Sequence, residues 1–158
     1  MVANHGESEM NKTYAEIIQN VMAFGSEVNG TVEVLGFNYR LPSANDRLVT
    51  IEERKLVLPF AIGEFLWLMT GRNDVEPLAF FVPRMRDYSL KGVITNAYGP
   101  LIEPYLEEFV NKLGRDKGTR QAVMTIYSPR MWKDKDIACT LSLQAIERNG
   151  KLFWFTNM

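Results

Sequence analysis

The stretch that decides the fold of this chain runs from Ile137 to Met158 and reads IACTLSLQAIERNGKLFWFTNM. Its first part alternates, so that Cys139, Leu141 and Leu143 fall on one side of the backbone. A period of two predicts a β-strand. Asn149-Gly150 then predicts a two-residue hairpin turn, because both residues accept positive φ. We therefore expect a β-hairpin that carries a thiol on the apolar face of its first strand.

The thiol of Cys139 has two interpretations when it is considered alone. A single cysteine on an apolar strand face is most often a small, buried hydrophobic side chain. A reactive or metal-binding cysteine needs partners elsewhere in the chain. Cys139 is the only cysteine, and His5 in the polar N-terminal stretch is the only histidine. The chain therefore lacks the histidines that a histidine-based catalytic dyad or a histidine-rich metal site requires, and we expect no metal.

Composition narrows the class of protein. The chain has 158 residues and is 46% hydrophobic, which is enough for the core of one domain or of part of one. Its net charge of −1 provides no basic field for nucleic acid. A single cysteine excludes an internal disulfide framework and predicts a cytoplasmic protein. The longest apolar run, residues 56–69, is too short to span a bilayer, so we expect no membrane partner.

Helix signals occur in three places. Thr13 and Glu16 form a capping box, which predicts that a helix begins at Thr13 after a disordered tail of residues 1–12. Pro59 opens a strongly apolar helix that we expect to end before Gly71. Pro104 opens another, after a long irregular loop over residues 83–100. Each of these helices is expected to bury one apolar face.

Strand signals lie between these helices. Residues 31–41 and 121–127 both read as strands, and Asn29-Gly30 reads as a turn. Helices mixed with non-alternating strands predict an α+β fold. The apolar run of residues 152–155 needs cover on both faces, and we expect either a chain cut inside its domain or a partner that covers that strand. We assign residues 13–158 to one incomplete domain.

Glu64 is the most informative residue besides Cys139. It lies in the apolar helix, between Ile62 and the run Phe65–Met69. A carboxylate among side chains that favour burial faces a cavity or a partner, and burial there raises its pKa. Such a group suits a general acid or base. The alternative is a narrow solvent-facing stripe of the helix.

Arg120 follows Gly118-Thr119 at the start of a predicted strand. A guanidinium beside a turn can bind a phosphate through two parallel hydrogen bonds. From the sequence alone, a solvated surface arginine explains Arg120 better. Tyr98-Gly99 at the end of the long loop either lines a pocket or forms an ordinary turn.

Three stretches together resemble the thymidylate synthase and pyrimidine-nucleotide hydroxymethylase family. They are AIGEFLWLMTG around Glu64, TRQAVMTIYSPR from Thr119, and DIACTLSLQ around Cys139, in that order and spacing. GTVEVLGFNYRL is similar to the family's first strand, and Tyr98-Gly99-Pro100 to the tyrosine-glycine pair after its long active-site loop. The resemblance covers about residues 14–158. It implies a layered α+β fold with a mixed sheet and flanking helices, incomplete at the C-terminus.

The resemblance also implies a chemistry. A cysteine thiolate attacks carbon 6 of a pyrimidine nucleoside monophosphate, and carbon 5 then takes a one-carbon unit from 5,10-methylene-tetrahydrofolate. A synthase reduces the new group to methyl, whereas a hydroxymethylase adds water. By resemblance Cys139 is the nucleophile and Glu64 relays protons through water. Arg120 matches an arginine that reaches the nucleotide phosphate of the neighbouring subunit, which implies a homodimer. Tyr98 and Gln144 are the other expected substrate contacts.

Several departures from the family pattern favour a divergent branch. Thr140 stands where synthases usually have histidine after the cysteine, and Gln121 replaces the second arginine of the cross-subunit pair. The loop of residues 25–30 contains no arginine. These changes favour a dCMP or CMP hydroxymethylase over a thymidylate synthase. The family segments that bind phosphate, read the pyrimidine edge and hold much of the folate have no counterpart up to Met158.

Two competing interpretations remain open at this point. The first is a truncated, catalytically inactive family derivative that acts in dimerisation or binding. The second is an unrelated small α+β binding domain. The enzyme interpretation predicts that the 158-residue chain alone has no measurable transferase activity and that it associates.

Overall fold

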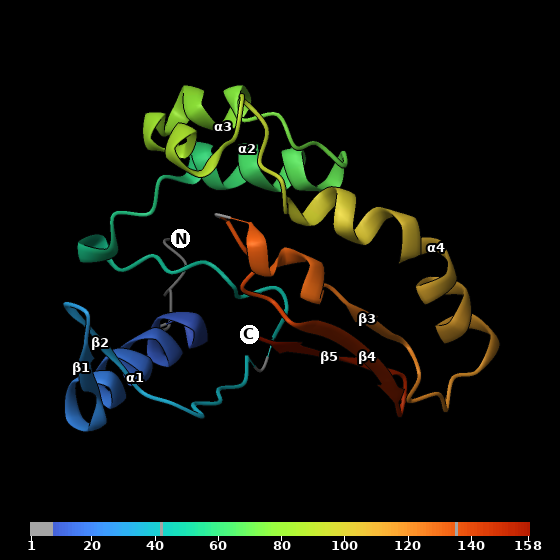
Figure 1. The fold of residues 1–158 in the computed structure, drawn as a ribbon. Coiled ribbons are helices and arrows are strands. Elements are labelled where there is room, and N and C mark those ends of the chain that lie inside the picture. The colour runs from blue at the N-terminus through green and yellow to red at the C-terminus, as the bar shows by residue number, and fades with distance from the viewer. Residues whose placement is uncertain (1–7, 42, 135) are drawn as a thin grey trace, which may run out of the picture. The chain divides into compact units, whose positions relative to one another are not determined.

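The computed structural model describes residues 8–41, 43–134 and 136–158. The chain divides into two compact units, Met1–Val57 and Leu58–Met158. Figure 1 labels the helices and strands of both units. The candidate catalytic residues Glu64 and Cys139 both belong to the second unit.

The first unit is built on helix α1 (Glu9–Phe24). The Ser8 side chain accepts a hydrogen bond from the backbone N–H of Asn11 and so caps the helix. The Asp46 carboxylate accepts two more hydrogen bonds, from the backbone N–H groups of Glu9 and Met10. The expected start at Thr13 is therefore wrong. A carboxylate distant in sequence and the Ser8 hydroxyl supply the cap one turn earlier.

A short hairpin follows α1. Strands β1 (Ser26–Val28) and β2 (Thr31–Glu33) pair antiparallel. Asn29 and Gly30 both have positive φ in the turn between them, as the sequence predicts. The predicted strand over residues 31–41 is too long, because regular pairing ends at Glu33. The unit is completed by a short 3-10 helix, η1 (Glu52–Arg54).

Helices dominate the first half of the second unit. They are α2 (Leu58–Met69), α3 (Glu76–Phe81), the 3-10 helix η2 (Pro83–Tyr88) and α4 (Tyr98–Arg115). The packed centre of this half is a cluster of buried apolar side chains from α2, α3 and the segment before α4. Its members are Trp67, Val75, Leu78, Ala79, Ile94 and Ala97. None of the described helices is long and apolar enough to cross a bilayer.

Helix α4 begins earlier than the sequence predicts. The expected start was Pro104, with Tyr98 at the end of a loop, whereas Tyr98 is the first residue of α4 and Pro104 lies inside it. Pro104 is the seventh residue of α4, beyond the four N–H groups that lack an intrahelical partner, so the helix continues through it with one backbone hydrogen bond fewer. Tyr98 is therefore fixed to a regular element.

A three-stranded antiparallel sheet forms the other half of this unit. Its order is β3 (Val123–Thr125), β4 (Ser142–Arg148) and β5 (Lys151–Asn157). The turn at Asn149 and Gly150 has positive φ at both residues, as predicted. Helix α4 packs on one face of the sheet (Figure 1) through the buried cluster of Phe109, Ala122, Met124 and Ala145. Phe109 also meets Trp154 edge-on.

The first strand of the hairpin is shorter than expected. β4 begins at Ser142, so Cys139 lies before it in an irregular segment that follows the 3-10 helix η3 (Pro129–Lys133). Cys139 and Leu141 share a side, as predicted, and around the cysteine this side is exposed, whereas Ala138 and Thr140 are buried. Within β4 the same predicted face is covered, because Ala145 is buried. The interpretation of Cys139 as a small buried hydrophobic side chain is therefore wrong.

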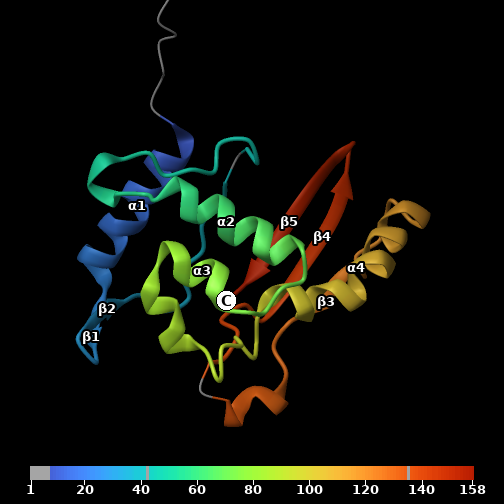
Figure 2. The ribbon, with the colours of Figure 1, turned by 90° about the horizontal axis from the view of Figure 1, so that it is seen from above.

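These elements confirm the α+β class. Every strand pair in residues 8–41, 43–134 and 136–158 is antiparallel, so this part of the chain does not contain the mixed sheet that we expected. The second view of the ribbon, Figure 2, separates α4 from the β4–β5 hairpin and shows the two elements running beside each other within the second unit.

Candidate active site

The segment around Cys139 is held at its C-terminal end by the sheet. The backbone N–H of Leu141 donates to the carbonyl of Asn157 at 2.7 Å, and the backbone N–H of Ile126 donates to the carbonyl of Leu141 at 2.9 Å. Thr140, next to the cysteine, is 9% exposed. Buried neighbours on both sides thus leave Cys139 turned outward with an accessible thiol. A small electrophile can reach such a thiol without unfolding of the chain.

The segment before α4 contacts the Cys139 segment from the other side. The Tyr98 hydroxyl oxygen accepts a hydrogen bond of 3.2 Å from the backbone N–H of Thr140. The Asn96 side-chain amide donates to the Asp134 carboxylate at 3.0 Å and to the carbonyl of Asp136 at 2.6 Å. Burial raises the pKa of the Asp136 carboxyl. Tyr98 is thus next to the candidate nucleophile, as the resemblance implies for a site residue.

Gly99 connects the same part of α4 to α2. A Cβ on Gly99 would lie 2.6 Å from the carbonyl oxygen of Leu68 and 3.0 Å from the Cα of Gly71. Only a residue without a side chain permits this approach of two backbones. The two residues of the pair Tyr98-Gly99 therefore make different contacts. The phenol of Tyr98 contacts the Cys139 segment, and Gly99 contacts the end of α2.

Glu64 lies on α2, on the side of the helix that packs. Phe60, Trp67 and Leu68, which are three or four residues away from it, all belong to the buried cluster of this unit or pack against it. Glu64 itself is exposed, yet the protein around its carboxyl displaces enough water to raise its pKa above the ordinary value. Within residues 8–41, 43–134 and 136–158 it forms no ion pair or hydrogen bond. Its raised pKa therefore comes from desolvation alone.

The opposite side of α2 is apolar and exposed. Its members, spaced by three or four residues, are Ile62, Phe65, Leu66 and Met69, with between 52% and 60% of each side chain exposed. The predicted burial of every apolar side chain in this helix is therefore wrong for the second unit taken by itself.

Arg120 and Gln144 are brought together by the sheet. The Gln144 side-chain amide donates to the backbone carbonyl of Arg120 at 2.9 Å, and Val123 pairs with Gln144 in the register of β3 and β4. Gln144 is five residues beyond Cys139, which corresponds to roughly 16 Å of extended chain. The Arg120 backbone therefore lies beside β4 at Gln144, five residues along the chain from the thiol.

The site residues predicted from the sequence thus form two groups. Cys139 and Tyr98 meet at Thr140, and Arg120 and Gln144 meet along β4. Glu64 belongs to α2, which approaches the start of α4 at Gly99 and shares a buried cluster with Ile94 and Ala97 through Trp67. Asn96 was not predicted. Its signal in the sequence is a polar residue in ITNAYG, immediately before the tyrosine-glycine pair.

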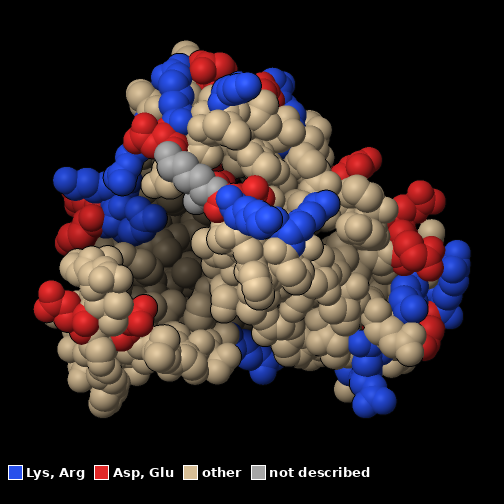
Figure 3. All heavy atoms as spheres, viewed as in Figure 1, with Lys and Arg blue, Asp and Glu red and all other residues tan. Residues whose placement is uncertain are grey.

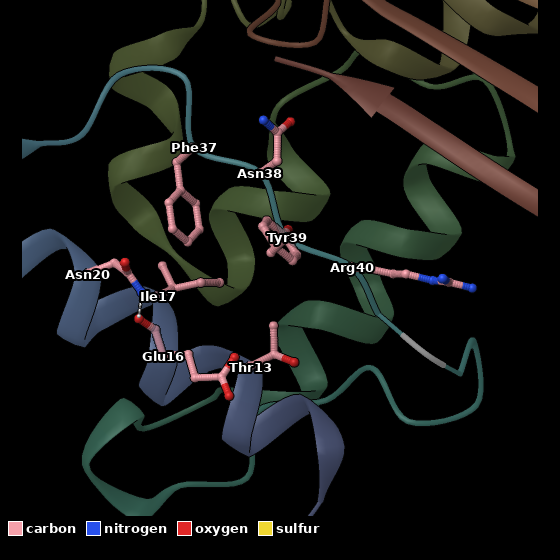
Figure 4. Close-up of a pocket in the computed structure, with 8 residues that line it drawn as sticks. All are labelled: Thr13, Glu16, Ile17, Asn20, Phe37, Asn38, Tyr39 and Arg40. Carbon is pink, nitrogen blue, oxygen red and sulfur yellow. Dashed lines mark hydrogen bonds between the residues drawn. The ribbon is translucent and has the colours of Figure 1, made fainter.

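A cavity of about 330 Å³ lies in the first unit. Figure 4 shows its lining, which comes from α1 and from the segment of residues 37–40. The lining residues are Thr13, Glu16, Ile17, Asn20, Phe37, Asn38, Tyr39 and Arg40. None of the five site residues predicted from the sequence is among them, so the cavity is not the predicted nucleotide site.

On the face drawn in Figure 3, Lys and Arg side chains are interspersed with Asp and Glu. Among the residues that the structure describes, no three histidine, cysteine, aspartate or glutamate side chains are grouped so as to hold a metal ion.

Comparison with known proteins confirms the resemblance to thymidylate synthase-like pyrimidine-nucleotide hydroxymethylases. No family model matches the chain. Three curated phage proteins do match it, and each is described as a deoxyuridylate hydroxymethyltransferase. The chain is therefore similar to part of each of these hydroxymethyltransferases.

The similarity is partial in length. The protein of Bacillus phage SP01 is 34% identical over 59% of this chain and 30% of its own length. The protein of Delftia phage PhiW-14 is 25% identical over 80% of this chain and 43% of its own length. The protein of Pseudomonas phage M6 is 34% identical over 64% of this chain and 31% of its own length. The chain thus spans less than half the length of these relatives.

Proposed function

We propose that this chain carries the nucleophile-bearing part of a thymidylate synthase-like hydroxymethyltransferase that acts on carbon 5 of a pyrimidine nucleoside monophosphate. The observation that carries the proposal is an accessible cysteine, Cys139, held beside Tyr98 in a chain similar to three phage deoxyuridylate hydroxymethyltransferases. The layered fold and the assignment of residues 13–158 to one incomplete domain belong to the same proposal.

Cys139 supplies the nucleophile in this scheme. Its thiolate forms a bond to carbon 6 of the base, and the electron pair of the carbon 5–carbon 6 double bond makes carbon 5 nucleophilic. Carbon 5 bonds to the methylene carbon of the folate. It then loses its proton to a base as the folate nitrogen leaves that methylene carbon, which gives an exocyclic methylene group. Water then adds to the exocyclic methylene carbon. Departure of the thiolate from carbon 6 restores the double bond and leaves a hydroxymethyl group on carbon 5.

Glu64 suits the proton transfers of this scheme. A carboxyl whose pKa is raised by desolvation exchanges a proton closer to neutral pH than an ordinary glutamate does. We propose that Glu64 organises the water that is added and relays the proton that leaves carbon 5. Tyr98 and Gln144 are proposed as contacts of the nucleotide.

5,10-Methylene-tetrahydrofolate is proposed as the co-substrate, because it supplies a carbon at the oxidation level of formaldehyde. None of the described side chains is assigned to the folate. The proposal for this part of the chain therefore concerns the nucleotide and its activation only. A cytoplasmic location also stays a prediction, based on the single cysteine.

The substrate base needs a direct test. Thr140 and Gln121 depart from the synthase pattern, and this led us to expect dCMP or CMP as substrate. The names of the relatives specify deoxyuridylate instead. We propose dUMP as the first nucleotide to test, with dCMP and CMP as the alternatives.

A homodimer is proposed because of Arg120. Its backbone lies beside Gln144, roughly 16 Å of extended chain from Cys139. Following the resemblance, we propose that its guanidinium binds the phosphate of the nucleotide in a second subunit. The sheet face opposite α4 offers a surface for such contact, because Val123 and Phe155 on it are both 47% exposed.

A second candidate is a catalytically inactive family derivative that acts in dimerisation or binding. The exposed apolar side chains of β5 favour it, because Leu152 is 59% exposed and Trp154 52% exposed. Large exposed apolar areas mark binding surfaces. Both candidates require a partner surface, and only the first requires the thiol.

The decisive experiment measures the release of tritium from carbon 5 of labelled nucleotide in the presence of methylene-tetrahydrofolate. It uses the protein isolated at its natural length, unsubstituted and as Cys139→Ala. The proposal predicts release by the unsubstituted protein and none by the variant, with nucleotide binding retained. Release of equal size by both proteins removes Cys139 from the mechanism. Nucleotide binding without release by either protein favours the binding derivative.

A further inference from the structure

Asn96 is a buried polar residue whose side-chain amide donates both of its hydrogen bonds to the segment that precedes Cys139. It is 7% exposed, and its side-chain amide donates hydrogen bonds to the Asp134 carboxylate and the Asp136 carbonyl. These partners are 38 and 40 residues away in sequence. A buried amide that lost such partners would carry the full cost of its desolvation. Asn96 therefore ties two segments that are distant in sequence.

Tyr98 makes a second tie to the same segment. Its hydroxyl oxygen accepts from the backbone N–H of Thr140, 42 residues away. The Asn96 contacts precede Cys139 in the chain, and the Tyr98 contact follows it. The backbone that carries the thiol is thus anchored on both sides to the residues that lead into α4.

We propose that Asn96 is a positioning residue which, together with Tyr98, holds the backbone of residues 136–140 so that the Cys139 thiol points outward in one orientation. This inference rests on the proposed role of Cys139 as nucleophile. Asn96 acts through the backbone and touches no reacting atom. Neither a family model nor the names of the relatives assign a role to this residue.

The geometry of the attack on carbon 6 explains why the thiol is held in one orientation. The thiolate must approach carbon 6 of the base within a narrow range of distance and angle, and a misplacement of about 1 Å can cost about 100-fold in rate. Cys139 lies in an irregular segment that the sheet holds only from Leu141 onward. Asn96 supplies part of that restraint through its charge-assisted hydrogen bond to Asp134 and its bond to the Asp136 carbonyl. Tyr98 supplies the rest by accepting from the backbone N–H of Thr140.

The ties can be measured without turnover. In Tyr98→Phe only the hydroxyl is lost, so amide hydrogen exchange at Thr140 should accelerate about 5-fold, which corresponds to one ordinary hydrogen bond. In Asn96→Asp a carboxylate faces Asp134 and Asp136, so exchange across residues 136–140 should accelerate by at least as much. The amide of Ala145, which donates to the Ala122 carbonyl within the sheet, should keep its rate.

A matched control separates this effect from general loosening. Tyr105 lies on the same helix, is 60% exposed and has no assigned role, so Tyr105→Phe should change neither amide. If Tyr98→Phe leaves exchange at Thr140 unchanged, the tie does not exist and the inference is overturned. If Asn96→Asp is too unstable to study, Asn96→Ser is measured in its place, with the same expectation.

A kinetic measurement separates positioning from mere structure. In the protein at its natural length, Asn96→Asp should lower kcat for the nucleotide about 10-fold with KM changed less than about 2-fold. Loosened amides with unchanged kcat overturn the positioning role. If the unsubstituted protein shows no turnover, the proposed function fails, while the exchange data still decide whether Asn96 and Tyr98 hold residues 136–140.

Discussion

Replacing Gly99 with alanine tests the close backbone contact between α2 and α4. The added Cβ would lie 2.6 Å from the Leu68 carbonyl oxygen, whereas ordinary contacts begin at 3.4 Å. The two helices must therefore separate by roughly 0.8 Å, or the backbone must distort by as much. Overpacking of this kind costs about 1–3 kcal/mol, and the higher helix propensity of alanine offsets up to about 1 kcal/mol of it. We expect Gly99→Ala to lower the free energy of unfolding by about 1–2 kcal/mol.

The matched control lies in the same helix. A Cβ on Gly114 meets nothing within 4 Å, and Gly114 lies within α4 at an exposed position. Gly114→Ala should therefore raise the free energy of unfolding by about 0.4–1 kcal/mol. Urea denaturation at constant m-value measures both variants. Equal stabilisation by the two substitutions would show that α2 and α4 do not approach each other at Gly99.

The remaining predictions concern the thiol, the carboxyl and association. An aromatic disulfide reagent should titrate one thiol per native chain, and none in Cys139→Ser, because Cys139 is exposed; a thiol that reacts only in denaturant contradicts this. Burial raises the pKa of Glu64, so this carboxyl favours folding below its unfolded pKa and loses that contribution as pH rises through its folded pKa. Glu64→Gln should accordingly stabilise the chain more, relative to the unsubstituted chain, at about pH 7 than at about pH 4, and equal shifts at both would be inconsistent with a desolvated carboxyl. The chain should sediment as an associated species that Phe155→Lys shifts toward monomer, since Phe155 is exposed on an apolar edge strand, and a monomer at all concentrations would contradict this.

Local signals predicted the turns and most helices. Asn29-Gly30 and Asn149-Gly150 adopt the positive φ that such pairs favour. Pro59 and Gly71 bracket α2 to within one or two residues. These features depend on a few neighbouring residues, so the sequence alone contains their cause.

Boundaries set by contacts distant in sequence were not predicted. Asp46 helps to start α1 before Thr13, and the packing of Gly99 on α2 accompanies a start of α4 at Tyr98. Neither partner is near in sequence to the element that it stabilises. A capping box and a proline supplied local signals that tertiary contacts overrode.

The candidate site was predicted in its residues and not in its geometry. The strand pattern around Cys139 gave the correct alternation but the wrong sense, because Ala138 and Thr140 are buried instead of Cys139. Period-two patterns fix which residues share a side and leave open which side is covered. Asn96 was missed because a single polar residue in a loop gives no periodic signal.

The most direct test of the central claim is mass analysis of the nucleotide product. The protein at its natural length is incubated with dUMP and 5,10-methylene-tetrahydrofolate, and in parallel as Cys139→Ala. A nucleotide that has gained one CH2O unit on carbon 5, formed by the unsubstituted protein and not by the variant, is the predicted result. The same product formed at the same rate by Cys139→Ala would contradict the role of Cys139 as the nucleophile.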